Sequence, residues 1–324
     1  MIISLPKFAI LLLLILATTL PPVEEPPVEE PKSIRNVWVT SDIGQGDPDD
    51  IQSMIHLLQF SDQLKIRGIT VGYPRGDVSV LERVLEAYGE DYRNNRGFDN
   101  HIKPWRIDYF QGQQREADWS SNRAVRALVR ESHKDRYSWR EPLIILSWGA
   151  CTDVVAAIEN GLNRRNVFIY AVSGFTSLDW NATQDPRSFE RLVDAVRYRR
   201  ILAGSTIRGI YFGWNLRRNR AFVRRNVTPF GALGREFMRA SRGINTGSDS
   251  IKMGDTPSVL WALSSERLRP VQESVGGSFE KYDTRLWGVR SDMSIGIFPG
   301  AATIQRVRFT RSWERQIKQI YGAD

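Results

Sequence analysis

The sequence has few of the residues that build disulfide frameworks, transition-metal sites or membrane bundles. Its 324 residues include one cysteine and three histidines, which excludes an internal disulfide and makes a zinc site of cysteine and histidine ligands unexpected. The single cysteine, Cys151, follows an apolar stretch, which favours a buried small residue over a nucleophile. The longest apolar run, Phe8 to Leu20, is shorter than the ~20 residues that a membrane-spanning helix needs.

The N-terminal segment is typical of export. Residues 1–20 carry one lysine before the apolar run, so a signal peptide is predicted, with an uncleaved membrane anchor as the alternative. Residues 21–32 contain the duplicated Pro-Glu sequence "PPVEEPPVEEP", a stiff and solvated spacer that cannot pack a core. We therefore expect one folded domain over residues 33–324 that is secreted, periplasmic or otherwise outside the cytoplasm, tethered to a membrane if the anchor stays.

The charge balance is basic but carries no recognition motif. The formal net charge is +8, and arginines are densest in "NLRRNRAFVRRN", residues 215–226. A solvated face of an amphipathic helix accounts for this run, and without a nucleic-acid motif no specific nucleic acid is expected as a partner. Affinity for acidic surfaces is the weaker expectation that remains. No oligomeric state follows from the sequence.

Apolar runs alternate with helical patterns after the spacer. Such alternation predicts an α/β fold with a mainly parallel sheet covered by helices on both faces, and a site at the C-terminal strand ends. Residues 265–310 are loop-like. The expected strands are 36–42, 64–73, 104–112, 142–150, 166–174 and 206–213, and the expected helices include 48–61, 78–92, 120–133 and 186–202.

An acidic turn, "VTSDIGQGDPDDIQ", follows the first expected strand at residues 39–52. Asp47 can cap the next helix, with Asp49 and Asp50 in its first turn, which is a structural explanation for three of the four acids. It does not explain Asp42, which ends a buried strand and faces the same turn. Carboxylates that converge in this way stay ionised together when a cation compensates them, and oxygen ligands select calcium or magnesium.

This turn resembles the Asp-x-Gly-x-Asp-Asp turn of the nucleoside hydrolase superfamily, in a longer form. That form is closest to a secreted nucleoside-hydrolase-like branch, often described as cellulose-binding or of unknown function. Further motifs are similar in type and order across about residues 36–290. They are "LIILSWGACTDVVAAI" (143–158), "SLDWNATQDPRSF" (177–189), "NVTPFGALG" (226–234) and "MGDTPSVLWAL" (253–263).

The resemblance implies a calcium-dependent hydrolase of N-glycosidic bonds that acts on a small nucleoside or sugar. It implies that Asp42 is both the catalytic base and a calcium ligand, together with Asp50, Asp255 and the backbone carbonyl of Trp148. The implied sugar-binding residues are Asp49, Asp179 and Asn181. Two structural alternatives stay open, since Asp255 can cap the helix that follows it and Asn181 begins the glycosylation sequon "NAT".

The sequence departs from the family pattern at two histidine positions, which are Gly254 and Phe230 here. Both departures concern protonation of the leaving group. The competing hypothesis is therefore a non-catalytic carbohydrate-binding module on the same fold, with Trp148, Trp180 and Trp214 as exposed stacking residues.

Overall fold

The computed structural model describes residues 34–44, 48–172, 180–195, 201–204, 216–241, 251, 253–263, 279–283, 286–289 and 313–322. Residues Pro31–Asp324 form one compact unit, and the prediction of a single domain over 33–324 stays a prediction. The strands are β1 (Arg35–Ser41), β2 (Leu64–Val71), β3 (Tyr109–Gln111), β4 (Leu143–Ser147), β5 (Val167–Ala171), β6 (Ile201–Gly204), β7 (Phe279–Asp283) and β8 (Leu286–Val289).

The helices occupy the intervals between strands and continue after β6. They are α2 (Pro48–Gln59), α3 (Val78–Asn94), α4 (Arg123–Ser132), α5 (Thr152–Glu159), α6 (Trp180–Gln184), α7 (Pro186–Ala195), α8 (Leu216–Asn226), α9 (Gly231–Ser241) and α10 (Thr256–Leu263), with the short 3-10 helices η1 (Arg96–Phe98) and η2 (Pro104–Arg106) between α3 and β3. Residues 313–321 are also helical.

The strands form one sheet in the order β3-β2-β1-β4-β5-β6-β8-β7, and every described pairing is parallel except that of β7 with β8. The chain moves from β1 outward to β2 and β3, then returns to the other side of β1 with β4. The strand order therefore reverses between β1 and β4. In open parallel sheets, ligand sites form in the crevice outside the strand ends at such a switch point.

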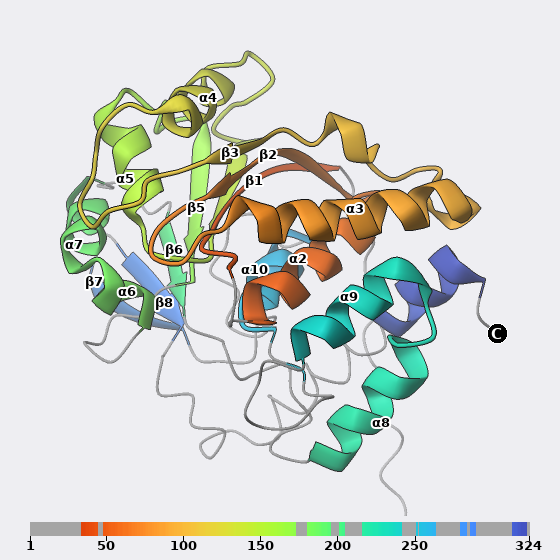
Figure 1. Ribbon diagram of the computed structural model, residues 1–324. Helices are drawn as coiled ribbons and strands as arrows, with labels where there is room; N and C mark the ends of the chain where they lie inside the picture. The colour runs from red at the N-terminus through yellow and green to blue at the C-terminus, as the bar shows by residue number, and fades with distance from the viewer. Residues whose placement is uncertain are drawn as a thin grey trace, which may run out of the picture. The chain divides into compact units, whose positions relative to one another are not determined.

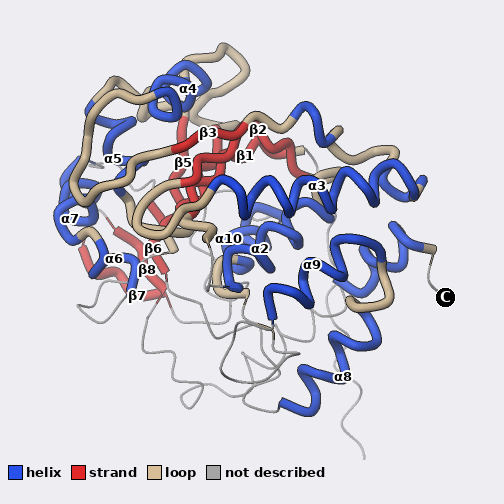
Figure 2. Tube along the Cα trace, in the orientation of Figure 1, coloured by secondary structure: helices blue, strands red, loops and turns tan. Residues whose placement is uncertain are grey.

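The central strands are apolar on both sides because helices cover both faces of the sheet, as Figures 1 and 2 show. Alternate residues of each strand enter different cores. Val37 and Val39 pack with α2, α3, α9 and α10, whereas Trp38 packs with α4, α5 and α7. The same alternation continues in β4, where Leu146 joins the first core and Ile145 the second.

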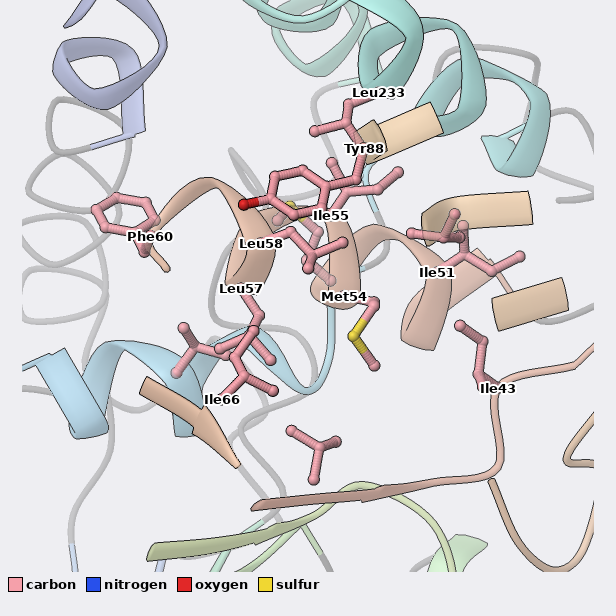
Figure 3. Close-up of a cluster of buried hydrophobic side chains, with 14 of the residues drawn as sticks. Ile43, Ile51, Met54, Ile55, Leu57, Leu58, Phe60, Ile66, Tyr88 and Leu233 are labelled. Carbon is pink, nitrogen blue, oxygen red and sulfur yellow. The ribbon is translucent and has the colours of Figure 1, made fainter. Parts of the chain in front are cut away.

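Helix α2 lies in the larger of these cores. All twelve of its residues are buried, so the helix that carries two acidic residues in its first turn is fixed along its whole length. Figure 3 shows Ile51, Met54, Ile55, Leu57 and Leu58 of α2 beside Tyr88 of α3 and Leu233 of α9. This packing holds the N-terminus of α2 against the end of β1.

The sequence prediction of an α/β fold with a mainly parallel sheet is confirmed, and some boundaries were wrong. Residues 104–112 were expected as one strand, but Pro104 opens a 3-10 turn and only Tyr109–Gln111 pair with β2. The helix expected to reach residue 202 is wrong at its end, because residues 201–204 pair with β5 as β6. The strand expected at 206–213 lies outside the described residues.

The loop-like stretch 265–310 contains the hairpin of β7 and β8. No helix among the described residues is long and apolar enough to cross a bilayer.

Candidate functional site

The acidic turn lies at the switch point of the sheet. Asp42 directly follows β1, and Asp49 and Asp50 occupy the first turn of α2. All three side chains are less than a tenth exposed. The hydroxyl of Ser41 donates to Asp50 Oδ1 over 2.5 Å and accepts the backbone N–H of Ile43 over 3.0 Å. The end of β1 and the first turn of α2 are thus tied together, while residues 45–47, including the expected cap Asp47, lie outside the described residues.

The turn after β4 approaches Asp42 through a glycine. A Cβ atom placed on Gly149 would lie 2.7 Å from Asp42 Oδ1, so the carboxylate occupies the space that a larger residue would fill. The backbone N–H of Trp148 donates to Thr40 O over 2.7 Å, which fixes this turn to β1. Gly149 is therefore needed for the close approach, and it places the Trp148 backbone beside the first aspartate.

Trp148 is buried and connects two remote segments. Its indole N–H donates to Ser258 Oγ over 2.8 Å, and the Ser258 hydroxyl donates to Asp255 O over 2.6 Å. The turn that carries Asp255 is thereby fixed to the end of β4. The expectation that Trp148 is an exposed stacking residue is wrong, because its side chain is only 1% exposed. The side chains of Trp180 and Trp214, the other two expected stacking residues, lie outside the described part of the chain.

Asn181 bridges two strand ends. Its side-chain amide donates to Trp148 O and to Val172 O, both over 2.7 Å. Val172 follows β5, so this one side chain joins the ends of β4 and β5. The carbonyl expected to bind calcium already accepts one hydrogen bond, and a carbonyl oxygen has a second lone pair. Both amide protons of Asn181 are engaged by the backbone, so a sugar hydroxyl would have to approach its Oδ1. Asp179 lies outside the described residues.

The motif at residues 253–263 contacts the acidic turn. The backbone N–H of Gly254 donates to Asp49 Oδ1, and a Cβ on Gly254 would lie 2.4 Å from Asp49 Oδ2. The position where the family has a histidine is therefore occupied at close range by the Asp49 carboxylate. Asp255 is 3% exposed and directly precedes α10, which packs on α2. Its structural alternative as a helix cap stays open.

The three histidines of the chain all lie away from this edge. His101 Nε2 is 3.0 Å from the backbone oxygen of Gln59, the last residue of α2. At 1.5 Å per residue, Gln59 is ~15 Å along the helix from Asp49. His133 contacts Gly161 O beyond the C-terminal end of α5. His56 is fully buried between Phe60 and Trp313, and burial lowers its pKa to about 3. No histidine is placed to protonate a leaving group.

Phe230, the second family histidine position, is remote from the site. Its ring stacks on Tyr321 with centroids 5.5 Å apart. The turn that follows is held by Asp91, near the end of α3, which accepts the backbone N–H of Leu233 over 3.0 Å. Asp91 is ~20 Å along α3 from Val78, where that helix starts near the acidic turn. Phe230 therefore does not bear on leaving-group chemistry, which corrects the inference from the sequence.

A buried aspartate that sequence reasoning missed lies at the neighbouring strand ends. Asp153, in the first turn of α5, accepts the backbone N–H of Gln113 over 2.7 Å. Its carboxylate fills the space beside Gly72 after β2 and Gly112 after β3. Burial raises its pKa to about 7, the Asp118 charge adds to this, and the Gln113 hydrogen bond opposes it. The only signal in the sequence was an acid at a helix start, which ordinarily indicates a solvated first turn.

The donor types at the switch point suit a hard cation. Asp42, Asp50 and Asp255 supply carboxylates and Trp148 a carbonyl, the oxygen donors that calcium prefers. Within the described ranges, however, no three His, Cys, Asp or Glu side chains are grouped to hold a metal ion. The residues fit calcium in chemistry but do not form a closed cage, so binding would draw the carboxylates together. The calcium site stays a prediction.

Comparisons with known proteins agree with this arrangement. Residues 36–178 match the family model "Cellulose-binding Sde182, nucleoside hydrolase-like domain". No curated protein matches the chain. A solved nucleoside hydrolase-related hypothetical protein from Saccharophagus degradans, described as associated with carbohydrate metabolism, superposes with a TM-score of 0.63 at 17% identity, covering 89% of this chain and 72% of that one.

Two effector structures are also similar. The effector protein XOO4466 gives a TM-score of 0.54, and the type III effector protein XopQ, solved with adenosine diphosphate ribose, gives 0.53. Each is 12% identical, and each alignment covers 88% of this chain and 95% of the effector. At these identities the superpositions show the fold alone. The resemblance inferred from the motifs is confirmed: the chain is nucleoside-hydrolase-like in fold, and over residues 36–178 it matches the cellulose-binding Sde182 type of that domain.

Proposed function

We propose that the chain binds a sugar and a calcium ion at the acidic edge, by which we mean the switch point of the sheet with Asp42, Asp49, Asp50 and Asp255. We propose that it hydrolyses an N-glycosidic bond there, that of a ribonucleoside or a related compound. The observation that carries the proposal is that Asp42 after β1 and Asp49 and Asp50 at the start of α2 are buried at the switch point, with Asp255 buried directly before α10. Carboxylate oxygens are the ligands that calcium prefers, and the switch point of a parallel sheet is where ligand sites form.

The cation would be held by Asp42, Asp50, Asp255 and the Trp148 carbonyl. When bound, calcium would supply a water of lowered pKa and a template for two vicinal sugar hydroxyls. Asp42 would accept the proton of the attacking water as the water oxygen bonds to the anomeric carbon. The carbon–nitrogen bond would break, its electron pair would leave with the base, and solvent would supply the proton that the base then takes.

The remaining residues would orient the sugar. Asp49 would accept a hydrogen bond from one hydroxyl, and the Gly254 N–H fixes its carboxylate for that purpose. Asn181 would accept from another hydroxyl through Oδ1, because its amide protons bind the ends of β4 and β5. Asp179 is proposed to bind a further hydroxyl. The signal segment would place this activity outside the cytoplasm, at a membrane if it is not cleaved.

Carbohydrate binding without turnover is the second candidate. The observation that favours it is the absence of any of the chain's three histidines from the acidic edge, because a positioned general acid contributes roughly 10²–10⁴-fold to such reactions. The family description of the match also names cellulose binding. In this case the same edge would hold a sugar and its cation without activating water.

Turnover separates the two candidates. The assay measures nitrophenol release from a nitrophenyl riboside, and base release from inosine and uridine, with calcium and with chelator. We expect calcium-dependent release from the activated riboside and slower release from the nucleosides. Asp42→Asn should lower turnover by ~10²-fold or more. The control is Asp135→Asn, an exposed acid before β4 that should change nothing. If neither nitrophenol nor base is released in calcium, hydrolysis is refuted and carbohydrate binding without turnover is the candidate that remains.

A further inference from the structure

An exposed aromatic surface lies outside the acidic edge. Four large hydrophobic residues are exposed among the described residues: Ile34, Trp105, Tyr109 and Trp139. Trp105 and Tyr109 belong to one short segment that leads from α3 into the edge strand β3, drawn in gold to yellow in Figure 1. Trp105 is 68% exposed and Tyr109 is 37% exposed.

Trp105 is exposed on a rigid support. The Tyr88 hydroxyl donates to Ile102 O over 2.6 Å, which anchors the backbone just before the 3-10 turn. Pro104 packs beside Gly89, where a Cβ would lie 3.9 Å from the proline ring. The Tyr92 ring meets the indole edge to face, with centroids 5.7 Å apart and planes at 82°. These contacts hold the indole in one place and still leave most of its surface in water.

Tyr109, in the same segment, is held by a hydrogen bond to α3. Its hydroxyl donates to Glu82 Oε1 over 2.9 Å, which fixes the ring beside α3. Glu82 and Gly89, the α3 residues next to Tyr109 and to the Trp105 turn, are seven positions apart. At 1.5 Å per residue the two aromatic residues are supported at points ~10 Å apart along the helix.

The surroundings suit a neutral polysaccharide. Charged residues of both signs, Lys103, Arg106 and Asp108, are exposed beside the two rings. The Lys103 ammonium lies over the Trp105 ring, 5.7 Å from its centroid, so this exposed side chain has to move aside before a sugar stacks on that face. Sugar rings present flat faces of C–H groups and a rim of hydroxyls, so they stack on aromatic side chains and pair with polar groups at the edges. Charges of mixed sign favour a neutral polymer over an anionic one.

We infer that Trp105 and Tyr109 form a stacking platform for an extended neutral glycan, separate from the acidic edge. The inference rests on the carbohydrate-binding candidate above and gives it a surface. It also replaces the stacking role expected for Trp148, which is buried. Tyr109 opens β3, so the platform lies beside the edge strand of the sheet.

The test is retention of the full chain on microcrystalline cellulose, with cellohexaose titration as the solution measurement. Trp105→Ala should weaken binding by about tenfold or more, and Tyr109→Ala should weaken it to a smaller extent. Trp139→Ala is the matched control, since Trp139 is also exposed, at 59%, but lies in the loop before β4; it should bind like the wild type. Unchanged melting temperatures would show that all variants fold.

The outcomes also separate this inference from the function proposed for the acidic edge. If Trp105→Ala and Tyr109→Ala bind cellohexaose like the wild type while Asp49→Asn does not, glycan binds at the acidic edge and the platform is refuted. If the wild type binds neither cellulose nor cellohexaose, the platform and the carbohydrate-binding candidate both fail. Riboside turnover is expected to be the same in Trp105→Ala and the wild type. If neither protein hydrolyses the riboside, the proposed hydrolysis fails and the glycan platform is unaffected.

Discussion

Replacing Asp153 by asparagine should remove a pH dependence of stability that this one carboxyl contributes. The folded-state pKa of Asp153, about 7, lies above the ordinary aspartate value of 3.8. Between these values the folded chain keeps a proton that the unfolded chain has lost, so this contribution to stability falls as the pH rises from about 4 through 7. At ~1.4 kcal/mol per pKa unit, the upper limit of the loss is about 4 kcal/mol.

Asparagine is neutral at every pH and keeps an oxygen to accept the Gln113 N–H over 2.7 Å. Asp153→Asn should therefore be more stable than the wild type by about 1.5 kcal/mol at pH 5 and by about 4 kcal/mol at pH 8, so that the difference grows by about 2–3 kcal/mol. Urea unfolding at both pH values measures this, and the difference between the proteins cancels the other titrating groups. A difference that does not change from pH 5 to pH 8 would refute the reasoning.

Three further substitutions test the contacts of the site and its surroundings. Gly254→His should lower turnover and stability instead of restoring a general acid, because its Cβ would lie 2.4 Å from Asp49 Oδ2; a rise in inosine hydrolysis would contradict this. Asn181→Ala should destabilise the chain by about 1–3 kcal/mol, since two buried strand-end carbonyls lose their donor; a melt checks this, with Asn100→Ala at an exposed turn as the control. Phe230→His should leave riboside turnover unchanged, because this side chain stacks on Tyr321 away from the site; altered kinetics at equal stability would show otherwise.

Local patterns carried most of the fold and part of the site. The apolar run that ends at Asp42 and the acids that open α2 are adjacent in the chain, so strand, turn and helix could be read together. The predicted strand boundaries were wrong at the sheet edge and at turns. Pro104 is an example, because its ring favours a 3-10 turn over an extended strand.

Contacts between remote segments could not be predicted. The indole of Trp148 reaches Ser258 across 110 positions, which turns an apparent stacking residue into a buried support for Asp255. Asp153 is an ordinary acid at a helix start in the sequence, and only the packing against Gly72 and Gly112 makes it a buried one. The same limit explains Phe230, where a family motif indicated the residue type but not the edge of the sheet on which it lies.

Calcium binding to the acidic edge is the central claim, and a thermal melt of the full chain in calcium and in chelator tests it most directly. At calcium concentrations about a hundredfold above Kd, binding to the folded state alone contributes about 2.7 kcal/mol. At ~2.1 cal/mol/K of unfolding entropy per residue, this corresponds to a rise of about 4–5 °C for a domain of roughly 290 residues. We expect this rise in the wild type and in Asp135→Asn, and its loss in Asp50→Asn. Equal melting temperatures of the wild type in calcium and in chelator would contradict it.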